Sequence, residues 1–279
     1  MKNALKSTLS IVCPLAVGMG AYFLACPTAG AQAPAAPAQP SKKEVRMTPD
    51  GKWPVHSMER PRPEGVPPQY DGRRVPVPKG AELLFDGKSL ENWKSRKLDP
   101  SKNSDAAGWT VVAGEEGYFE VVPKTGPIQT RGVIVGDGHL HIEWATPSEV
   151  VGKGQGRGNS GVFIGGYPEV QVLDSFENDT YPDGQAAALY GMYPPRVNAS
   201  RKPGEWQAYD IVIERAKERD GKVEHRQRIS VWHNGVLVQD GVELDGKQQE
   251  GALELQDHGN PMRFRNIWFL PMGSASGAK

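Results

Sequence analysis

Between about residue 81 and residue 271, hydrophobic residues recur at every second position in short runs. Examples are GHLHIEWAT (138–146), PEVQVLD (168–174) and AYDIVIERA (208–216), and Gly, Pro, Asn or Asp residues separate such runs along the chain. Alternation with a period of two places hydrophobic side chains on one face of a strand and polar side chains on the other. The pattern therefore predicts β-strands throughout this region, with turns between them.

The number and spacing of these runs indicate the fold class. Roughly ten short strands fall within about 190 residues, and no segment has sustained helical periodicity. His233-Asn234-Gly235-Val236 contains the Asn-Gly pair of a tight hairpin between two strands. We therefore expect one all-β domain over residues 80–271, built as an antiparallel β-sandwich.

The first 31 residues have a different pattern. Lys2 and Lys6 precede a mostly hydrophobic run, and Ala29-Gly30-Ala31 provides a small-x-small cleavage site. These features predict a secretory signal peptide over residues 1–31. We expect export to the periplasm or the medium, with no stable membrane span after cleavage, because the run is short for a span. Retention as an anchor and a lipoprotein attached through Cys26 are the weaker alternatives.

Composition adds little chemistry but excludes some functions. Residues 32–79 are rich in Pro, first with Ala and then with Arg, which predicts a linker or a strap lying on the domain, and residues 272–279 are expected to be a flexible tail. Cys13 and Cys26 both lie in the signal segment, so the mature chain has no disulfide. It would carry 31 basic and 33 acidic residues, which gives no reason to expect a nucleic acid or an anionic membrane as a partner.

The strand over residues 169–173 carries the first candidate chemistry. Glu169 and Gln171 alternate with two valines, so the carboxylate and the carboxamide share one face. A rigid strand with a buried back is a suitable platform for a sugar-binding or catalytic cleft. With Asp174, the spacing resembles the E-x-D-x-x-E cluster of retaining β-glucanases, but Gln171 replaces the middle acid and weakens the double-carboxylate mechanism.

A second polar cluster spans QDHGNPMRFRN (256–266). His258 precedes a glycine at a strand end and is a candidate catalytic residue. Arg263 and Arg265 share a strand face, and we expect one of them to point into the same cleft as Glu169, because two unpaired guanidinium groups over a core would be costly. The remaining candidates for substrate binding are Asn159, Gln171, Asp174, Tyr190, Trp206, Asp257, Asn260 and Arg265.

Metal binding is a weaker alternative. His139, His141 and Glu143 share one strand face and could bind a metal, but no third histidine lies nearby in the sequence. We predict no cofactor and no metal ligand, with a divalent metal as a possible alternative.

Several long segments resemble a known family. These are FDGKSLENW (85–93), NSGVFIGG (159–166), EVQVLDS (169–175), LYGMYPPRVNASRKPGEWQAYDI (189–211), HNGVLVQD (233–240) and LQDHGNPMRFRNIW (255–268). In this order they are similar to the 3-keto-disaccharide hydrolase family, also described as 3-keto-glucoside 1,2-lyase/3-keto-2-hydroxy-glucal hydratase. The resemblance covers nearly all of residues 80–271 and implies a jelly-roll sandwich of the concanavalin A type.

The resemblance also implies a reaction. A ketone at C3 of a sugar acidifies the hydrogen at C2, so a base forms an enolate, the C1 substituent leaves, and water adds to the glucal. Such a site needs a base, a group that stabilises the enolate and an acid near the leaving oxygen. We expect Glu169 or His258 to be the base and Arg263 or Arg265 to hold the enolate oxygen, with a metal as the alternative for that role.

Two other functions remain open from the sequence. One is a conventional retaining glycoside hydrolase that uses Glu169 and Asp174. The other is a non-catalytic carbohydrate-binding module that the Pro-rich segment tethers to the envelope.

Overall fold

The structure is a computed structural model that describes residues 45–96, 104–245 and 250–273. The predicted signal peptide (1–31), the start of the predicted linker and most of the predicted tail lie outside these ranges. Within them, no helix has the length and hydrophobicity needed to cross a bilayer.

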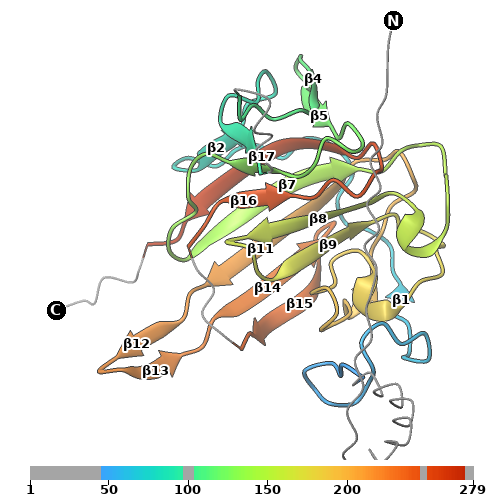
Figure 1. The fold of residues 1–279 in the computed structure, drawn as a ribbon, viewed down its shortest axis with the longest axis vertical. Helices are drawn as coiled ribbons and strands as arrows, with labels where there is room; N and C mark the ends of the chain where they lie inside the picture. Colours follow the sequence, from blue (N-terminus) through green and yellow to red (C-terminus); the bar gives the residue numbers. More distant parts are fainter. Residues whose placement is uncertain (1–44, 97–103, 246–249, 274–279) are drawn as a thin grey trace, which may run out of the picture. The chain divides into compact units, whose positions relative to one another are not determined.

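Two antiparallel sheets pack face to face as layers, as Figure 1 shows. The larger sheet of the described residues has the order β15 (Val236–Glu243), β14 (Arg228–His233), β11 (Gln207–Glu214), β7 (Gly138–Ala145), β17 (Arg263–Pro271), β5 (Tyr118–Glu120) and β4 (Thr110–Val112), with β2 (Glu82–Phe85) also paired to β17. The smaller sheet has the order β3 (Trp93–Ser95), β6 (Ile128–Thr130), β16 (Leu253–Leu255), β8 (Asn159–Ile164) and β9 (Glu169–Leu173). The predicted antiparallel β-sandwich is confirmed.

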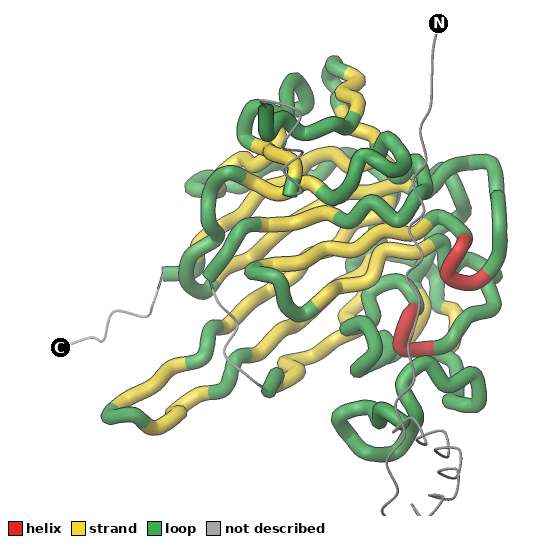
Figure 2. The backbone as a smooth tube through the Cα atoms, viewed as in Figure 1, coloured by secondary structure: helices red, strands yellow, loops and turns green. Residues whose placement is uncertain are grey.

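The remaining elements are small. β1 (Glu64–Gly65) pairs in parallel with β10 (Val197–Asn198), and β12 (Lys217–Arg219) forms a hairpin with β13 (Lys222–His225). The helical segments in the described ranges are two 3₁₀ turns, η1 (Gly154–Gly156) and η2 (Pro182–Gly184), drawn in red in Figure 2. Helix is thus almost absent from this part of the chain, as the hydrophobic period predicts.

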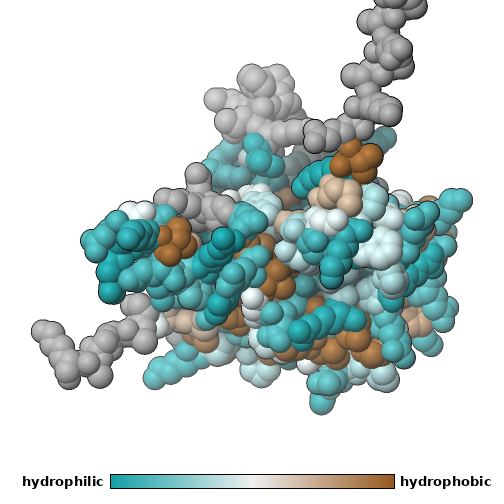
Figure 3. All heavy atoms as spheres, turned by 90° about the horizontal axis from the view of Figure 1, so that it is seen from below, coloured by the Kyte–Doolittle hydropathy of each residue, from teal (hydrophilic) through white to brown (hydrophobic). Residues whose placement is uncertain are grey.

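The core lies between the two sheets because each strand turns its alternate hydrophobic residues inward. Val162 and Val170 of the smaller sheet belong to the same buried cluster as Ile142, Tyr209 and Phe264 of the larger sheet. Each such side chain, when fully buried, contributes roughly 1.5–3 kcal/mol through the hydrophobic effect. On the face drawn in Figure 3, hydrophobic side chains form separate patches among hydrophilic ones.

Residues 45–79 are here called the strap, and their part around Tyr70 and Val75 forms hydrogen bonds to outward-facing polar groups of the larger sheet. The Val75 amide donates to Glu143 Oε1 at 2.8 Å, and Asn266 Nδ2 donates to the Val75 carbonyl at 2.8 Å. The Tyr70 amide donates to the Asn234 carbonyl at 2.9 Å. The strap therefore covers polar side chains that would otherwise face solvent.

Candidate active site

A polar cleft lies on the outer face of the smaller sheet. Three parts of the chain form it: the η1 turn, the paired strands β8 and β9 with the segment beside them, and the residues that follow β16. The lining residues are Gln155, Asn159, Glu169, Gln171, Tyr190, Gln256 and His258. Five of these seven are residues that the sequence predicts as site residues, and the structure brings them together.

The alternation and the register of β8 and β9 place the Glu169 carboxylate. Val170 and Val172 face the core, so Glu169 and Gln171 face outward, and Gly161 of β8 is paired with Gln171. A Cβ atom added to Gly161 would lie 2.2 Å from Glu169 Oε1. Gly161 therefore leaves the space into which the Glu169 side chain extends across β8.

Side-chain amides surround this carboxylate and hold one another in place. Gln155 Nε2 donates to Thr180 Oγ1 and to the Gly184 carbonyl, both at 2.8 Å, while the Gln155 carbonyl accepts from Asn159 Nδ2 at 2.7 Å. Gln171 Nε2 in turn donates to Gln155 Oε1 at 3.0 Å. Amides fixed in this way are suited to bind sugar hydroxyl groups.

The environment of Glu169 favours its protonated form. Burial raises the pKa of Glu169 to about 7, and the nearby negative charge of Glu254 adds to the effect. Glu254 itself is paired with Arg96 at 2.7 Å, and no cationic side chain of the described residues forms an ion pair with Glu169. A carboxylate with a pKa near 7 can accept and release a proton at neutral pH, as a general base must.

A tyrosine pair closes one side of the cleft. The hydroxyl of Tyr190 lies 2.7 Å from the hydroxyl of Tyr181, and the ring of His56 packs against both rings at centroid distances of 4.2 and 4.9 Å. The His56 amide donates to Asp183 Oδ2 at 2.9 Å, which fixes this part of the strap beside the cleft. Burial and the bond to Tyr190 raise the pKa of Tyr181, so this hydroxyl stays protonated.

Three other predicted residues lie near the cleft but serve different contacts. Asp174 lines an adjacent cavity and accepts from Arg157 Nε at 2.6 Å. Asn260 Oδ1 accepts from the Asn159 amide at 3.0 Å. Asp257 accepts from the amides of Gly126 and Gly259 at 2.8 and 2.9 Å, and these bonds shape the loop after β16.

The expectation that an arginine of residues 263–265 points into the Glu169 cleft is corrected by the structure. Arg263 and Arg265 belong to β17 of the larger sheet and lie on its outer face. Arg265 Nε donates to Glu143 Oε2 at 2.6 Å, and its guanidinium lies 4.1 Å from the ring centroid of Trp206. Trp206 is therefore also away from the cleft, where it stacks on an arginine.

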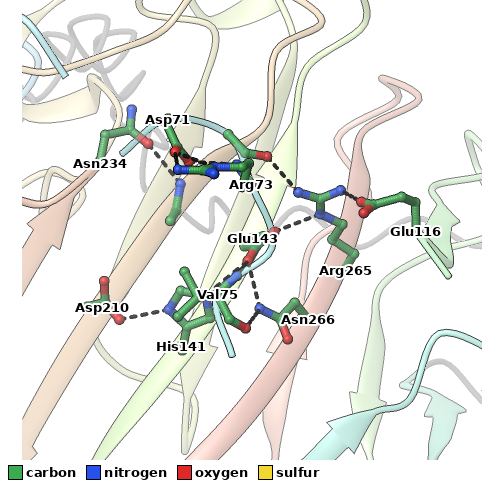
Figure 4. Close-up of polar contacts among 12 residues, drawn as sticks. Asp71, Arg73, Val75, Glu116, His141, Glu143, Asp210, Asn234, Arg265 and Asn266 are labelled. Carbon is green, nitrogen blue, oxygen red and sulfur yellow. Dashed lines mark hydrogen bonds and ion pairs between the residues drawn. The ribbon is translucent and has the colours of Figure 1, made fainter. Parts of the chain in front are cut away.

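The predicted metal-binding alternative at His139, His141 and Glu143 falls in the same network. His139 Nε2 and His141 Nδ1 lie 2.8 and 2.7 Å from Asp210 Oδ1. Figure 4 shows Glu143 between Arg265, Asn266 and His141. Among the residues that the structure describes, no group of three or more His, Cys, Asp or Glu side chains is arranged to hold a metal ion.

Sequence reasoning missed three residues of the cleft or its wall. Gln155 lies in the Gly-rich segment 152–158, where no alternation of residues indicates which way a side chain points. Part of this segment forms the η1 turn, and the Gly154 amide donates to Asn178 Oδ1 at 2.9 Å. Gln256 begins the predicted cluster of residues 256–266 but is not among the predicted site residues; its main-chain amide donates to the Gly161 carbonyl at 3.0 Å. His56 comes from the Pro-rich strap, where no local pattern indicates a site.

Comparison with known proteins identifies the class of protein. Residues 80–270 match the family described as a 3-keto-alpha-glucoside-1,2-lyase-like domain, and the chain belongs to this family of carbohydrate-active enzymes. The resemblance found in the sequence is thus confirmed.

Individual relatives agree with this family. A 3-keto-disaccharide hydrolase of Bacteroides thetaiotaomicron is 27% identical over 259 residues, which cover 71% of this chain and 81% of the relative. The crystal structure of a candidate glycosyl hydrolase from Parabacteroides distasonis is 37% identical, with a TM-score of 0.63, and covers 76% of this chain and 93% of its own. A second protein of this description from the same organism is 19% identical and has the same fold, with a TM-score of 0.50. The match covers 72% of this chain and 100% of that protein.

Proposed function

We propose that the protein cleaves 3-keto-glycosides by elimination and then hydrates the product, with Glu169 as the base. The observation that carries this proposal is the environment of Glu169. Its carboxylate is half-buried in a cleft lined by side-chain amides, no cationic side chain of the described residues is paired with it, and its pKa is raised to about 7. The name of the Bacteroides relative, a 3-keto-disaccharide hydrolase, supports the substrate class.

The steps use the residues of the cleft. The Glu169 carboxylate takes the proton from C2, and the electron pair forms an enolate with the C3 ketone. The enolate then expels the C1 substituent, whose oxygen receives a proton from His258, which is exposed at the rim of the cleft. The amide groups of Gln155, Asn159 and Gln171 bind the sugar oxygens, including the enolate oxygen. Water then adds to the double bond: its hydroxyl goes to C1, its other proton goes to His258, and the proton held by Glu169 returns to C2, which yields 3-keto-glucose.

The surroundings of the two carboxylates disfavour a conventional retaining hydrolase. Glu169 lines the cleft, whereas Asp174 lines the adjacent cavity. Asp174 is also bound to Arg157 at 2.6 Å, so its carboxylate is engaged within the protein. A retaining mechanism needs two carboxyl groups that face the same glycosidic bond about 5 Å apart.

The test is a comparison of 4-nitrophenyl glucoside with its 3-keto counterpart. We expect release of nitrophenol from the keto substrate alone, because only the ketone acidifies the proton at C2. Equal release from the unmodified glucoside would disprove elimination. Binding of both compounds without turnover would instead support the carbohydrate-binding module.

A further inference from the structure

A second cavity adjoins the Glu169 cleft. Two chain segments pass directly from one to the other. Asn159 lines the cleft and Gly158 the cavity, while His258 lines the cleft and Gly259 the cavity. The hydrogen bond between the Asn159 amide and Asn260 Oδ1 joins the two segments at this boundary. The cavity is therefore an extension of the cleft and not a separate surface feature.

The cavity begins beside the proposed acid for the leaving oxygen. His258 lines the cleft, and the next residue, Gly259, lines the cavity. A sugar ring bound in the cleft with its leaving oxygen at His258 would therefore place its C1 substituent at the cavity.

The chemistry of the cavity wall indicates what it binds. Arg157 and Asp174 are bound to each other at 2.6 Å, and Arg157 Nη2 also donates to the Phe176 carbonyl at 2.9 Å, so these charges are already satisfied within the protein. Val150 and Val151 are 50% and 64% exposed at the cavity, and Pro147 and Pro261 extend its hydrophobic wall. Adjacent exposed hydrophobic residues in a cavity next to a cleft are typical of a ligand contact.

We propose that this cavity is the subsite for the leaving group and that it prefers an apolar, aromatic aglycone to a second sugar. The hydrophobic wall would gain from covering an aryl ring, whereas the hydroxyl groups of a sugar would find Arg157 and Asp174 already paired. The exposed carboxylate of Glu149 at the cavity disfavours an anionic aglycone. The inference rests on the proposed function, since it assigns the leaving group of that reaction.

The experiment compares three 3-keto-glucosides with a methyl, a 4-nitrophenyl and a glucosyl aglycone. Each is measured with the wild type and with the double variant Val150→Ser/Val151→Ser. We expect kcat/KM for the nitrophenyl substrate to fall about tenfold, mainly through KM, while the methyl substrate changes less than about twofold. Val223→Ser is the matched control, because Val223 is 57% exposed on β13 and lies away from the cavity. This variant should leave kcat/KM unchanged for all three substrates.

Two outcomes would overturn the inference: equal losses for all three substrates, or a wild-type preference for the glucosyl aglycone in KM. If the wild type turns over none of them, the proposed function fails, and calorimetric binding of phenyl and methyl glucoside decides the subsite separately. Tighter binding of phenyl glucoside that the double variant loses supports the subsite. Equal affinities for the two glucosides, or a phenyl preference that the double variant retains, contradict it.

Discussion

The outer faces of the two sheets place acidic residues in opposite states. On the larger sheet Glu143 is fully buried, binds Arg265 and Asn266, and has a lowered pKa: burial opposes this shift, but the hydrogen bonds and the cation outweigh it. On the smaller sheet Glu169 has a raised pKa, because burial acts there without a described cation to oppose it. Both residues occupy outward-facing positions in their strands. The neighbouring hydrogen-bond donors and charges, rather than the position in the strand, therefore determine whether each carboxyl group is ionised.

The two acidic residues also differ in their access to a ligand. The network around Glu143 and Asp210 is closed by the strap, through Val75 and through the Gly72 carbonyl that accepts from Arg265 at 2.8 Å. The cleft around Glu169 remains open to a ligand.

The largest expected effect is on turnover in the Glu169 cleft of the smaller sheet. Glu169→Gln should lower kcat on a 3-keto-glucoside by about a thousandfold or more, because the amide cannot accept the C2 proton. Glu254→Gln, on the same outer face and paired with Arg96, is the control and should retain most of the rate. Wild-type rates in Glu169→Gln, measured with the fold verified by circular dichroism, would remove Glu169 from the mechanism.

The second largest expected effect is on the stability that the Glu143 network gives to the larger sheet. Arg265→Met should lower the free energy of unfolding by about 3–5 kcal/mol, because it leaves the buried Glu143 without its cation. Arg228→Met is the matched control: its ion pair with Glu243 is solvent-exposed, so the substitution should change the free energy of unfolding little. Chemical denaturation measures both variants. A folded Arg265→Met that loses turnover would show that the larger sheet takes part in the reaction.

The smallest effect concerns the pH dependence of stability. The pKa of Glu169 is about 7 in the folded protein against 4.5 as its ordinary value, so the folded state holds one more proton between these pH values. Stability contributed by this proton is present below pH 4.5 and is lost as the pH rises to 7. Glu169→Gln should therefore be more stable than the wild type at pH 8, by at most about 3 kcal/mol.

Denaturation curves from pH 4.5 to pH 8 test this expectation. The advantage of the variant should disappear at the acidic end of the series. Glu64→Gln, at an exposed position in β1, serves as the control. A constant difference across the pH range would mean that the folded protein does not shift the pKa of Glu169.

Much of the fold and part of the site follow from local sequence. Alternation in residues 168–174 is enough to place Glu169 and Gln171 on one outward face, because successive Cβ atoms of a strand point to opposite sides. Polar and aromatic residues near the strand ends place Asn159, Tyr190 and His258 among the candidates as well. Gln155 could not be predicted as a site residue, because a Gly-rich segment has no periodic pattern that shows which way its side chains point.

The sequence by itself determined the strand faces, the sandwich class and the family, since these depend on backbone geometry and on motifs within a few residues. Only the tertiary structure decided which sheet each strand joins. Arg265 and Glu169 are both outward-facing, yet pairing with β7 takes Arg265 to the other layer, where Glu143 holds it. Strand pairing and the pKa of Glu169 depend on residues far apart in the chain, and no local period encodes them.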